Sequence, residues 1–162
     1  MPKVFVCIGS NIDRDSSIRA GDADLRERYG ELQLSSVYES EAVGFEGDAF
    51  YNLVAAFDTS DSVDQVITTL AGIEEAHGRQ RGSERYTSRT LDLDLLLYGN
   101  LVASGEGYHV PRDEIPRYAF VLWPLSELEP AMKHPQTGKT FLSMWEGFDK
   151  RNQTLLPIPF QW

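Results

Sequence analysis

The chain has 162 residues, of which 41% are hydrophobic and 25% charged, and its formal net charge at pH 7 is −10. This length suits a single globular domain over residues 1–162 with a full hydrophobic core. The negative charge argues against a nucleic-acid partner, because phosphate backbones attract basic surfaces.

Features that bear on cellular location are few. No apolar run approaches the roughly 20 residues that cross a membrane. The chain starts directly with strand-like residues, without the charged and apolar regions of a signal peptide. Its only cysteine, Cys7, lies in an apolar run, which favours a buried core position over a nucleophile. We therefore expect a cytoplasmic monomer with no membrane partner.

The first 59 residues predict three strands and one helix. Apolar or alternating residues indicate the strands, and serine caps with a terminal glycine indicate the helix. Strands are expected at 3–8, 32–38 and 50–59, and a helix from a cap at Ser16 or Ser17 to Tyr29, with Gly30 as its stop. Glycines and acids at 39–49 indicate a loop.

The following segment predicts a second helix, a loop, a fourth strand and a hairpin. The helix has apolar residues at helical spacing behind a capping box, and the loop is polar and arginine-rich. We expect the helix between the Ser62–Gln65 box and Gly78, the loop at 79–88, the strand at 91–98, and 101–103 pairing back after a Gly99-Asn100 turn.

The last third of the chain predicts further helices. Pro116 can occupy the first turn of a helix that reaches Leu125 and is interrupted by Pro124, and a short helix is expected near 142–145. The element order β, α, β, β, α, β is that of a ferredoxin-like fold with both helices on one sheet face. We therefore predict an α+β, ferredoxin-like βαββαβ core with an additional C-terminal hairpin and helices.

Two acids on the predicted fourth strand are the first candidate site residues. Asp92 and Asp94 alternate with leucines, so both carboxylates point to one face of the strand, about 6–7 Å apart. Their repulsion, roughly 2–3 kcal/mol at an effective dielectric near 20, would be relieved by a hard cation. The alternative is a solvated strand face whose acids point to water.

Four arginines precede the acid pair: Arg79, Arg81, Arg85 and Arg89. Guanidinium groups match phosphate oxygens bidentately, and Mg²⁺ in proteins is usually held by one or two carboxylates plus substrate phosphates. The segment therefore predicts a phosphate clamp beside a magnesium ligand pair. The alternative is a loop whose arginines neutralise nearby acids.

Glu74 and the histidines are less informative. Glu74 lies in line with the apolar stripe of the second helix, so its carboxylate needs a partner, for which a nearby arginine is expected. Whether that pairing is structural or catalytic is open. His77, His109 and His134 lack metal-ligand spacing and are expected at the surface, and no Ser/His/Asp arrangement has recognisable local context.

Several sequence blocks occur together in one order. They are Gly9-Ser10-Asn11, Phe50-Tyr51-Asn52, Glu74 with Gly78-Arg79, Arg89-Thr90-Leu91-Asp92-Leu93-Asp94-Leu95, and Ala119-Phe120-Val121-Leu122-Trp123-Pro124-Leu125. With these blocks the chain resembles the 6-hydroxymethyl-7,8-dihydropterin pyrophosphokinase family of folate biosynthesis over nearly its whole length. The Arg-Thr-Leu-Asp-Leu-Asp run is the most specific of them.

The resemblance implies Mg²⁺-dependent transfer of pyrophosphate from ATP to the pterin hydroxymethyl group, with release of AMP. Asp92 and Asp94 would hold two magnesium ions, and Arg79 and Arg89 would neutralise phosphate charge as catalytic residues. The expected partners are therefore the pterin and ATP.

For the pterin, the resemblance implies stacking between Phe50 and Phe120 and hydrogen bonds from Asn52, with Val43 and Gly44 at the rim. Loops at about 43–49 and 79–88 correspond to lids that close over the site, and Tyr86 takes the place of a lid aromatic that is often Trp.

For ATP, the resemblance implies contacts from Glu74, Arg81, Arg112, Asp113, Arg117 and Tyr118. Here the chain departs from the family, because Arg112 replaces a histidine and Tyr118 replaces an arginine, with Arg117 one position earlier. Two alternatives stay open: a diverged paralogue with another nucleotide or acceptor, and a non-catalytic pterin-binding protein.

Overall fold

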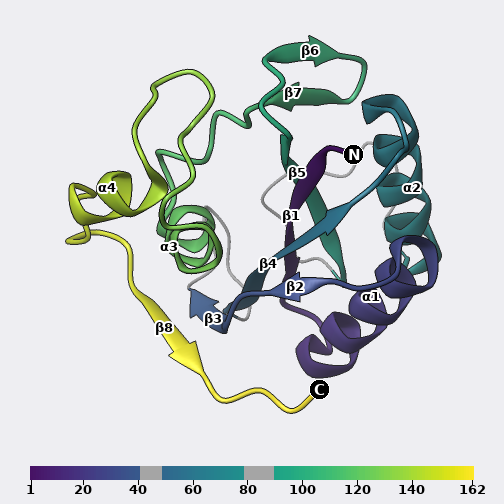
Figure 1. Ribbon diagram of the computed structural model, residues 1–162. Coiled ribbons are helices and arrows are strands. Elements are labelled where there is room, and N and C mark those ends of the chain that lie inside the picture. The colour runs from purple at the N-terminus through teal and green to yellow at the C-terminus, as the bar shows by residue number, and fades with distance from the viewer. Residues whose placement is uncertain (41–48, 79–89) are drawn as a thin grey trace.

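The computed structural model describes residues 1–40, 49–78 and 90–162 and is built on a six-stranded sheet (Figure 1). Its strand order is β5-β1-β4-β3-β8, with β2 also paired to β4, and neighbouring strands in the described ranges pair antiparallel. The strands are β1 (Lys3–Ser10), β2 (Gln33–Leu34), β3 (Val37–Ser40), β4 (Phe50–Asp58), β5 (Asp92–Tyr98) and β8 (Leu155–Ile158). The predicted βαββαβ core is confirmed.

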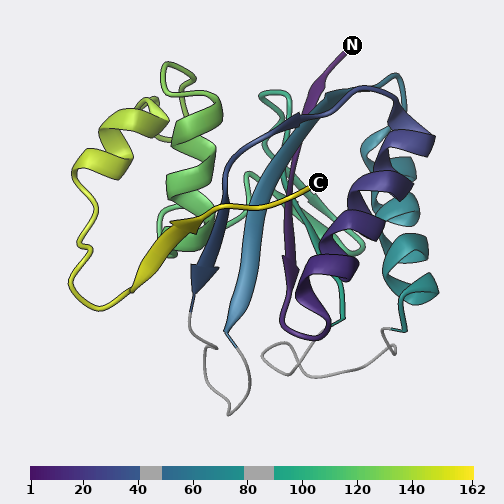
Figure 2. The same ribbon diagram turned by 90° about the horizontal axis from the view of Figure 1, so that it is seen from below.

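Helices cover both faces of the sheet (Figure 2). The helices α1 (Arg14–Tyr29) and α2 (Val63–Ala76) lie on one face, as predicted, over a core that includes Val4, Val6 and Ile8 of β1. On the opposite face α3 (Ala119–Leu128) and α4 (Phe141–Glu146) pack over Phe5 and Cys7. A strand that is buried on both faces reads as a continuous apolar run, which explains the sequence of β1.

Strand β5 carries a local irregularity. Its register against β1 shifts between Phe5 and Val6, so that Leu95 pairs with Val6 but Leu97 with Phe5. The extra residue, Leu96, is buried under α3 together with Leu97. Before this bulge the alternation is regular, with Leu93 and Leu95 in the core under α1 and α2.

Two of the predicted helix starts are corrected. The first is α1, which begins at Arg14 with Asp13 as its N-cap. Ser16 and Ser17 do not cap it, because their hydroxyls donate to the carbonyls of Asp13 and Ile12 instead of accepting a backbone N–H. The predicted capping box of α2, Ser62 with Gln65, is confirmed.

The second correction concerns α3. It begins after Tyr118, so Pro116 lies in the preceding turn, and the helix continues through Pro124. The predicted strand at 32–38 is also two strands, because Ser35 interrupts the ladder. Its hydroxyl accepts the N–H of Val54 at 2.9 Å, where a regular strand would use its carbonyl.

The predicted hairpin is displaced along the chain. Residues 101–103 do not pair back onto β5; instead β6 (Ala103–Gly105) and β7 (Tyr108–Val110) form a separate two-stranded sheet. Gly107, at φ 82°, makes the tight turn between them. The edge strand β8 was not predicted. None of the helices in the described ranges is long and apolar enough to cross a membrane.

Candidate active site

The two predicted metal ligands lie side by side at the start of β5. In the antiparallel register Asp94 is opposite Cys7 and Asp92 is opposite Gly9 of β1. Both aspartates are half-buried, on the sheet face opposite to Leu93. Strand alternation predicts this arrangement.

The buried thiol of Cys7 reports the charge around the acid pair. Burial raises its pKa first, the negative charges of Asp94 and Asp92 raise the pKa further, and the positive charge of Arg112 lowers it. This agrees with the geometry, because Asp94 is opposite Cys7 in register and Arg112 Nη2 lies 3.4 Å from Asp94 Oδ1. A neutral thiol provides no charge compensation for the two acids.

The chemistry of this pair suits a hard divalent cation. Carboxylate oxygens are the ligands that Mg²⁺ prefers, and half-burial leaves room for water and phosphate oxygens to complete an octahedron. Within the described ranges there is no group of three or more His, Cys, Asp or Glu side chains that could hold a metal ion. Bound nucleotide and water can supply further oxygen ligands.

Glu74 of α2 contacts the backbone of β5 between the two acids. Its carboxylate, on the last turn of α2 and buried, accepts the backbone N–H of Leu93 at 2.8 Å. Leu93 separates Asp92 from Asp94, so this bond fixes the segment of strand that presents both carboxylates. The arginine partner expected for Glu74 falls in segment 79–89, outside the described residues.

A row of residues paired in register crosses the sheet beside the acid pair. In register, Asp92 is opposite Gly9, Gly9 is opposite Asn52, and Asn52 is opposite Tyr38. The Asn52 amide donates to Ser40 Oγ at 2.8 Å, and a Cβ added at Gly9 would lie 2.8 Å from Asn52 Oδ1. Asp92 and Asn52 are thus two strand spacings apart, about 10 Å, with only a glycine between them.

The chain matches the model of a known protein family. The model of the 7,8-dihydro-6-hydroxymethylpterin-pyrophosphokinase (HPPK) family matches residues 5–130, from β1 past the end of α3. The chain belongs to the HPPK family.

Two curated relatives carry the name 2-amino-4-hydroxy-6-hydroxymethyldihydropteridine pyrophosphokinase. The protein from Pseudomonas aeruginosa is 35% identical over 137 residues, which cover 82% of this chain and 84% of the relative. The protein from Aquifex aeolicus is 33% identical over 137 residues, which cover 83% and 85%.

Solved structures agree on the fold. A crystal structure of a Plasmodium falciparum HPPK-DHPS variant superposes with a TM-score of 0.71 over 90% of this chain, at 11% identity. The chain spans 45% of that longer protein. At this identity the similarity shows a common fold alone.

The aromatic residues assigned to the pterin in the HPPK family occur on two elements. Phe50 opens β4, and its ring lies 3.8 Å from the position that a Cβ of Gly9 would take. Phe120 lies in the first turn of α3 and stacks on Tyr118, with ring centroids 5.2 Å apart. Phe120 also packs on the cluster with Tyr38, the neighbour of Asn52 across β3 and β4.

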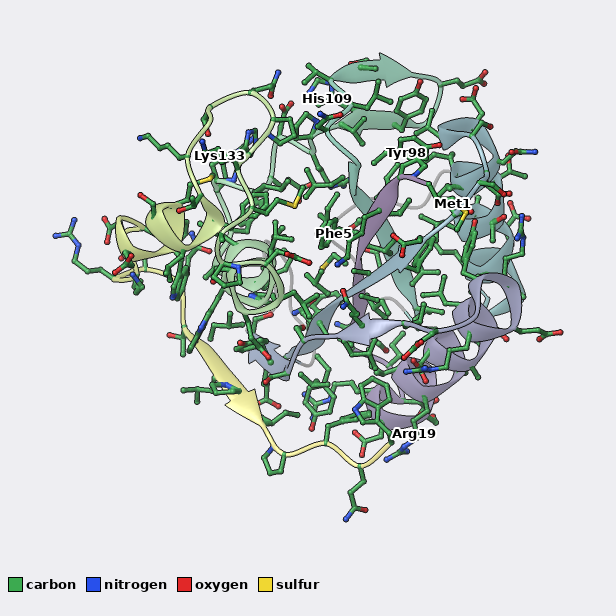
Figure 3. The ribbon with its side chains drawn as sticks, in the orientation of Figure 1. Met1, Phe5, Arg19, Tyr98, His109 and Lys133 are labelled. Carbon is green, nitrogen blue, oxygen red and sulfur yellow. The ribbon has the colours of Figure 1, made fainter. Side chains whose placement is uncertain are left out.

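The residues assigned to ATP are spread over the segment before α3. Arg112 reaches Asp94, with Nη2 to Oδ1 at 3.4 Å. Asp113 instead pairs with Nε2 of His109 at 3.0 Å, on the hairpin at the periphery (Figure 3). Arg117 lies over the ring of Tyr118, 5.9 Å from its centroid. Among these contacts, that of Arg112 reaches the acid pair.

Six other assigned residues lie outside the described residues: Val43, Gly44, Arg79, Arg81, Tyr86 and Arg89. Their roles stay predictions.

One prediction about histidines is wrong. His134 is buried, with 4% exposure, because its Nδ1 accepts the backbone N–H groups of Gln136 and Thr137 and its ring packs edge-on against Phe141. His109 is exposed, as predicted, and its Nδ1 lies 2.5 Å from Ser104 Oγ. The Ser104–His109–Asp113 chain joins the exposed hairpin to the turn that follows it, and it was not predicted.

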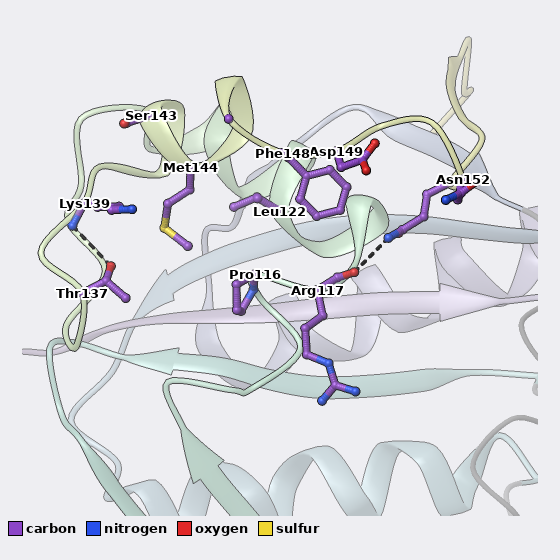
Figure 4. A pocket seen from close by; sticks show the side chains of 12 residues that line it. Pro116, Arg117, Leu122, Thr137, Lys139, Ser143, Met144, Phe148, Asp149 and Asn152 are labelled. Carbon is purple, nitrogen blue, oxygen red and sulfur yellow. Dashed lines mark hydrogen bonds between the residues drawn. The ribbon is translucent and has the colours of Figure 1, made fainter.

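A second supporting contact was also missed. Gln153 accepts the backbone N–H of Ala119 at 2.8 Å and donates to the carbonyl of Arg117 at 2.9 Å. Gln153 therefore holds the turn that leads into α3 and so positions Phe120. Gln153 and Arg117 also line an open cavity between α3, α4 and segment 149–153 (Figure 4). A lone glutamine in an irregular segment gives no sequence signal for such a role.

Proposed function

We propose that the chain transfers pyrophosphate from ATP to 6-hydroxymethyl-7,8-dihydropterin in folate biosynthesis, and releases AMP. The observation that carries this proposal is the pair Asp92 and Asp94, on one face of β5 in a member of the HPPK family. The acceptor hydroxyl oxygen forms a bond to the β-phosphorus as it loses its proton. The bond between that phosphorus and the oxygen that stays with AMP breaks.

The part played by the acids is electrostatic and geometric. Asp92 and Asp94 would hold two magnesium ions, which when bound neutralise phosphate charge and align the attacking and leaving oxygens. Glu74 keeps the two carboxylates at a fixed spacing through its bond to Leu93. Arg79 and Arg89 would add positive charge at the phosphates. Phosphoryl transfer depends mainly on such positioning and charge stabilisation.

The pterin would occupy the row above Gly9. Asn52 lies there with one amide hydrogen bonded to Ser40, and Oδ1 directed over the glycine. A flat heterocycle needs an open floor, an edge partner and aromatic faces, which Gly9, Asn52, Phe50 and Phe120 would provide. Val43 and Gly44 would close the rim, and Tyr86 would belong to a lid over the phosphates.

For the nucleotide we infer contacts from Glu74, Arg81 and Arg112, with Asp113, Arg117 and Tyr118 at the outer edge. A second candidate function, transfer from another nucleotide or to another acceptor, is supported by Arg112 at the acid pair and by Asp113, which pairs with His109 of the hairpin. We also infer a monomer in a reducing, cytoplasmic compartment, in keeping with one buried cysteine. Size-exclusion chromatography with light scattering tests the monomer.

A product analysis tests the function. The protein is incubated with Mg²⁺, ATP and hydroxymethyldihydropterin, and the nucleotide products are separated by chromatography. Equal amounts of AMP and pterin diphosphate are expected. Release of ADP would contradict pyrophosphoryl transfer. Turnover that occurs only with a nucleotide other than ATP would favour the second candidate function. Pterin binding without any turnover would leave a binding protein.

A further inference from the structure

Arg112 is anchored beside the strand that carries the acid pair. Its backbone N–H donates to the carbonyl of Leu96 at 3.0 Å, two residues along β5 from Asp94. Residue 112 therefore keeps its place relative to β5 through the backbone, whatever its side chain contacts. The side chain is 23% exposed, so its charge is only partly screened by water.

The guanidinium of Arg112 divides its contacts unequally between two acids. Nε and Nη2 lie 2.9 and 2.7 Å from Oε1 of Glu114, which is buried. Nη2 also lies 3.4 Å from Oδ1 of Asp94. Glu114 thus holds the guanidinium by its short contacts, and the longer contact leaves a positive charge at the edge of Asp94.

A fixed positive charge at that distance opposes a second cation on the same carboxylate. A bare divalent ion at Asp94 would be repelled by the guanidinium and would compete with it for Oδ1. A polyphosphate changes this balance, because it brings several negative charges that attract both cations. The short contacts to Glu114 are made by Nε and Nη2, so the N–H groups of Nη1 can donate to a phosphate oxygen.

We propose that Arg112, held by Glu114, makes metal binding at Asp94 depend on the nucleotide. The metal then loads together with ATP and binds only weakly beforehand. This inference rests on the proposed function, in which Asp94 is a metal ligand. It assigns to Arg112 control of the metal affinity, in addition to a contact with phosphate.

Titration with Mn²⁺ tests this coupling directly. The electron paramagnetic resonance signal of unbound Mn²⁺ gives the affinity of the whole chain with and without α,β-methylene-ATP, whose replaced bridge blocks transfer. A titration of the analogue alone accounts for the Mn²⁺ that it binds itself. In the wild type the analogue should tighten Mn²⁺ binding at least tenfold. Without the analogue, Arg112→Gln should bind Mn²⁺ about tenfold more tightly than the wild type, because the opposing charge is gone. The analogue should therefore tighten Mn²⁺ binding less in Arg112→Gln than in the wild type.

Three variants control for charge and folding. Arg151→Gln also removes one positive charge, but Arg151 is 85% exposed and pairs with Asp149, so Mn²⁺ affinity should stay within about twofold of the wild type. Arg112→Lys keeps the charge and should bind Mn²⁺ without nucleotide as weakly as the wild type. Glu114→Gln releases Arg112 toward Asp94 and should not tighten Mn²⁺ binding. If Arg112→Gln does not fold, the Arg112→Lys and Glu114→Gln affinities still test the proposal.

The results that overturn the proposal are distinct from those that overturn the function. Arg112→Gln without tighter Mn²⁺ binding, or equal tightening in Arg151→Gln, contradicts the role of Arg112 alone, as does tighter binding in Arg112→Lys or Glu114→Gln. Asp94→Asn that binds Mn²⁺ with the analogue as tightly as the wild type contradicts the metal role of Asp94, and both proposals then fail.

Discussion

The carboxylate of Glu74 accepts the backbone N–H of Leu93 at 2.8 Å, directly between the two acids of β5. The contact joins the last turn of α2 to the strand that presents Asp92 and Asp94, and it is buried. This hydrogen bond therefore explains the buried carboxylate of Glu74 without any contact to ATP.

Two substitutions at this position separate the structural role from a role of the charge. Glu74→Ala leaves the buried N–H of Leu93 without an acceptor and should lower the free energy of unfolding by about 1–3 kcal/mol. Glu74→Gln retains an acceptor oxygen and should keep most of that stability. Urea denaturation measures both. If Glu74→Gln is stable but its KM for ATP rises tenfold or more, the charge itself serves the nucleotide. Equal destabilisation by both substitutions would contradict the hydrogen-bond account.

A methyl group at Gly9 should damage the pterin site. In Gly9→Ala the new Cβ would lie 2.8 Å from Asn52 Oδ1, so Asn52 must shift away from Ser40 and the open floor is filled. We expect pterin affinity to fall at least about tenfold and stability by about 1–3 kcal/mol.

The matched control is Gly72→Ala on α2. Apart from its chain neighbours and the backbone of its own helix, no atom of the described residues lies within 4 Å of its added Cβ. Helix propensity alone should therefore act and stabilise the protein by up to about 1 kcal/mol. Calorimetric titration with the pterin measures the affinities. Unchanged binding in Gly9→Ala would place the pterin elsewhere.

Gln153 should affect pterin binding from outside the site. Gln153→Ala removes both bonds to the turn before α3 and should raise the KM for the pterin several-fold while changing kcat less, because Phe120 loses its fixed place. Gln153→Glu keeps an acceptor for Ala119 but cannot donate to the carbonyl of Arg117. Its KM for the pterin should therefore lie between those of the wild type and Gln153→Ala. Asn152→Ala, one residue away, is the control, and its kinetic constants should match those of the wild type.

His134 should make stability sensitive to mild acid. Burial lowers the pKa of His134 below its ordinary value of 6.5, because the charged ring is disfavoured among Phe141 and the turn at 134–137. The unfolded chain therefore takes up a proton first, so the stabilising effect of the neutral ring is complete above pH 6.5 and is lost as pH falls toward the folded pKa.

Thermal melts from pH 7.5 to 5 measure this effect. His134→Asn places an amide oxygen near Nδ1, where it can accept the same backbone N–H groups, but does not titrate. The melting temperature of this variant should fall less between these pH values than that of the wild type. Parallel curves would show that His134 does not control the dependence.

Regular alternation and local capping made much of this molecule predictable. Asp92 and Asp94 share a face because the strand around them alternates strictly, and Ser62 with Gln65 forms its box within four residues. The βαββαβ order follows from such local signals. The family resemblance assigns the metal to the same two acids, Asp92 and Asp94.

Contacts between distant segments were not predictable. Ser35 breaks a strand because its hydroxyl meets Val54, and β8 joins β3 from the far end of the chain. His134 is buried because a local turn closes around its ring nitrogen. Arg112 and Asp94 are 18 positions apart in the printed sequence, and no periodicity brings them together. Such pairings depend on how layers pack, which the pattern of one segment does not contain.

The most direct test of the account is the rate of AMP release from ATP and hydroxymethyldihydropterin in three proteins. Asp94→Asn keeps the size of the side chain but loses the charge that would hold a metal, whereas Asp149→Asn removes an exposed carboxylate that pairs only with Arg151 among the described residues. We predict that AMP release falls by a factor of about 100 or more in Asp94→Asn and is unchanged in Asp149→Asn. Wild-type rates in Asp94→Asn would contradict the central claim that the acid pair of β5 is the catalytic metal site.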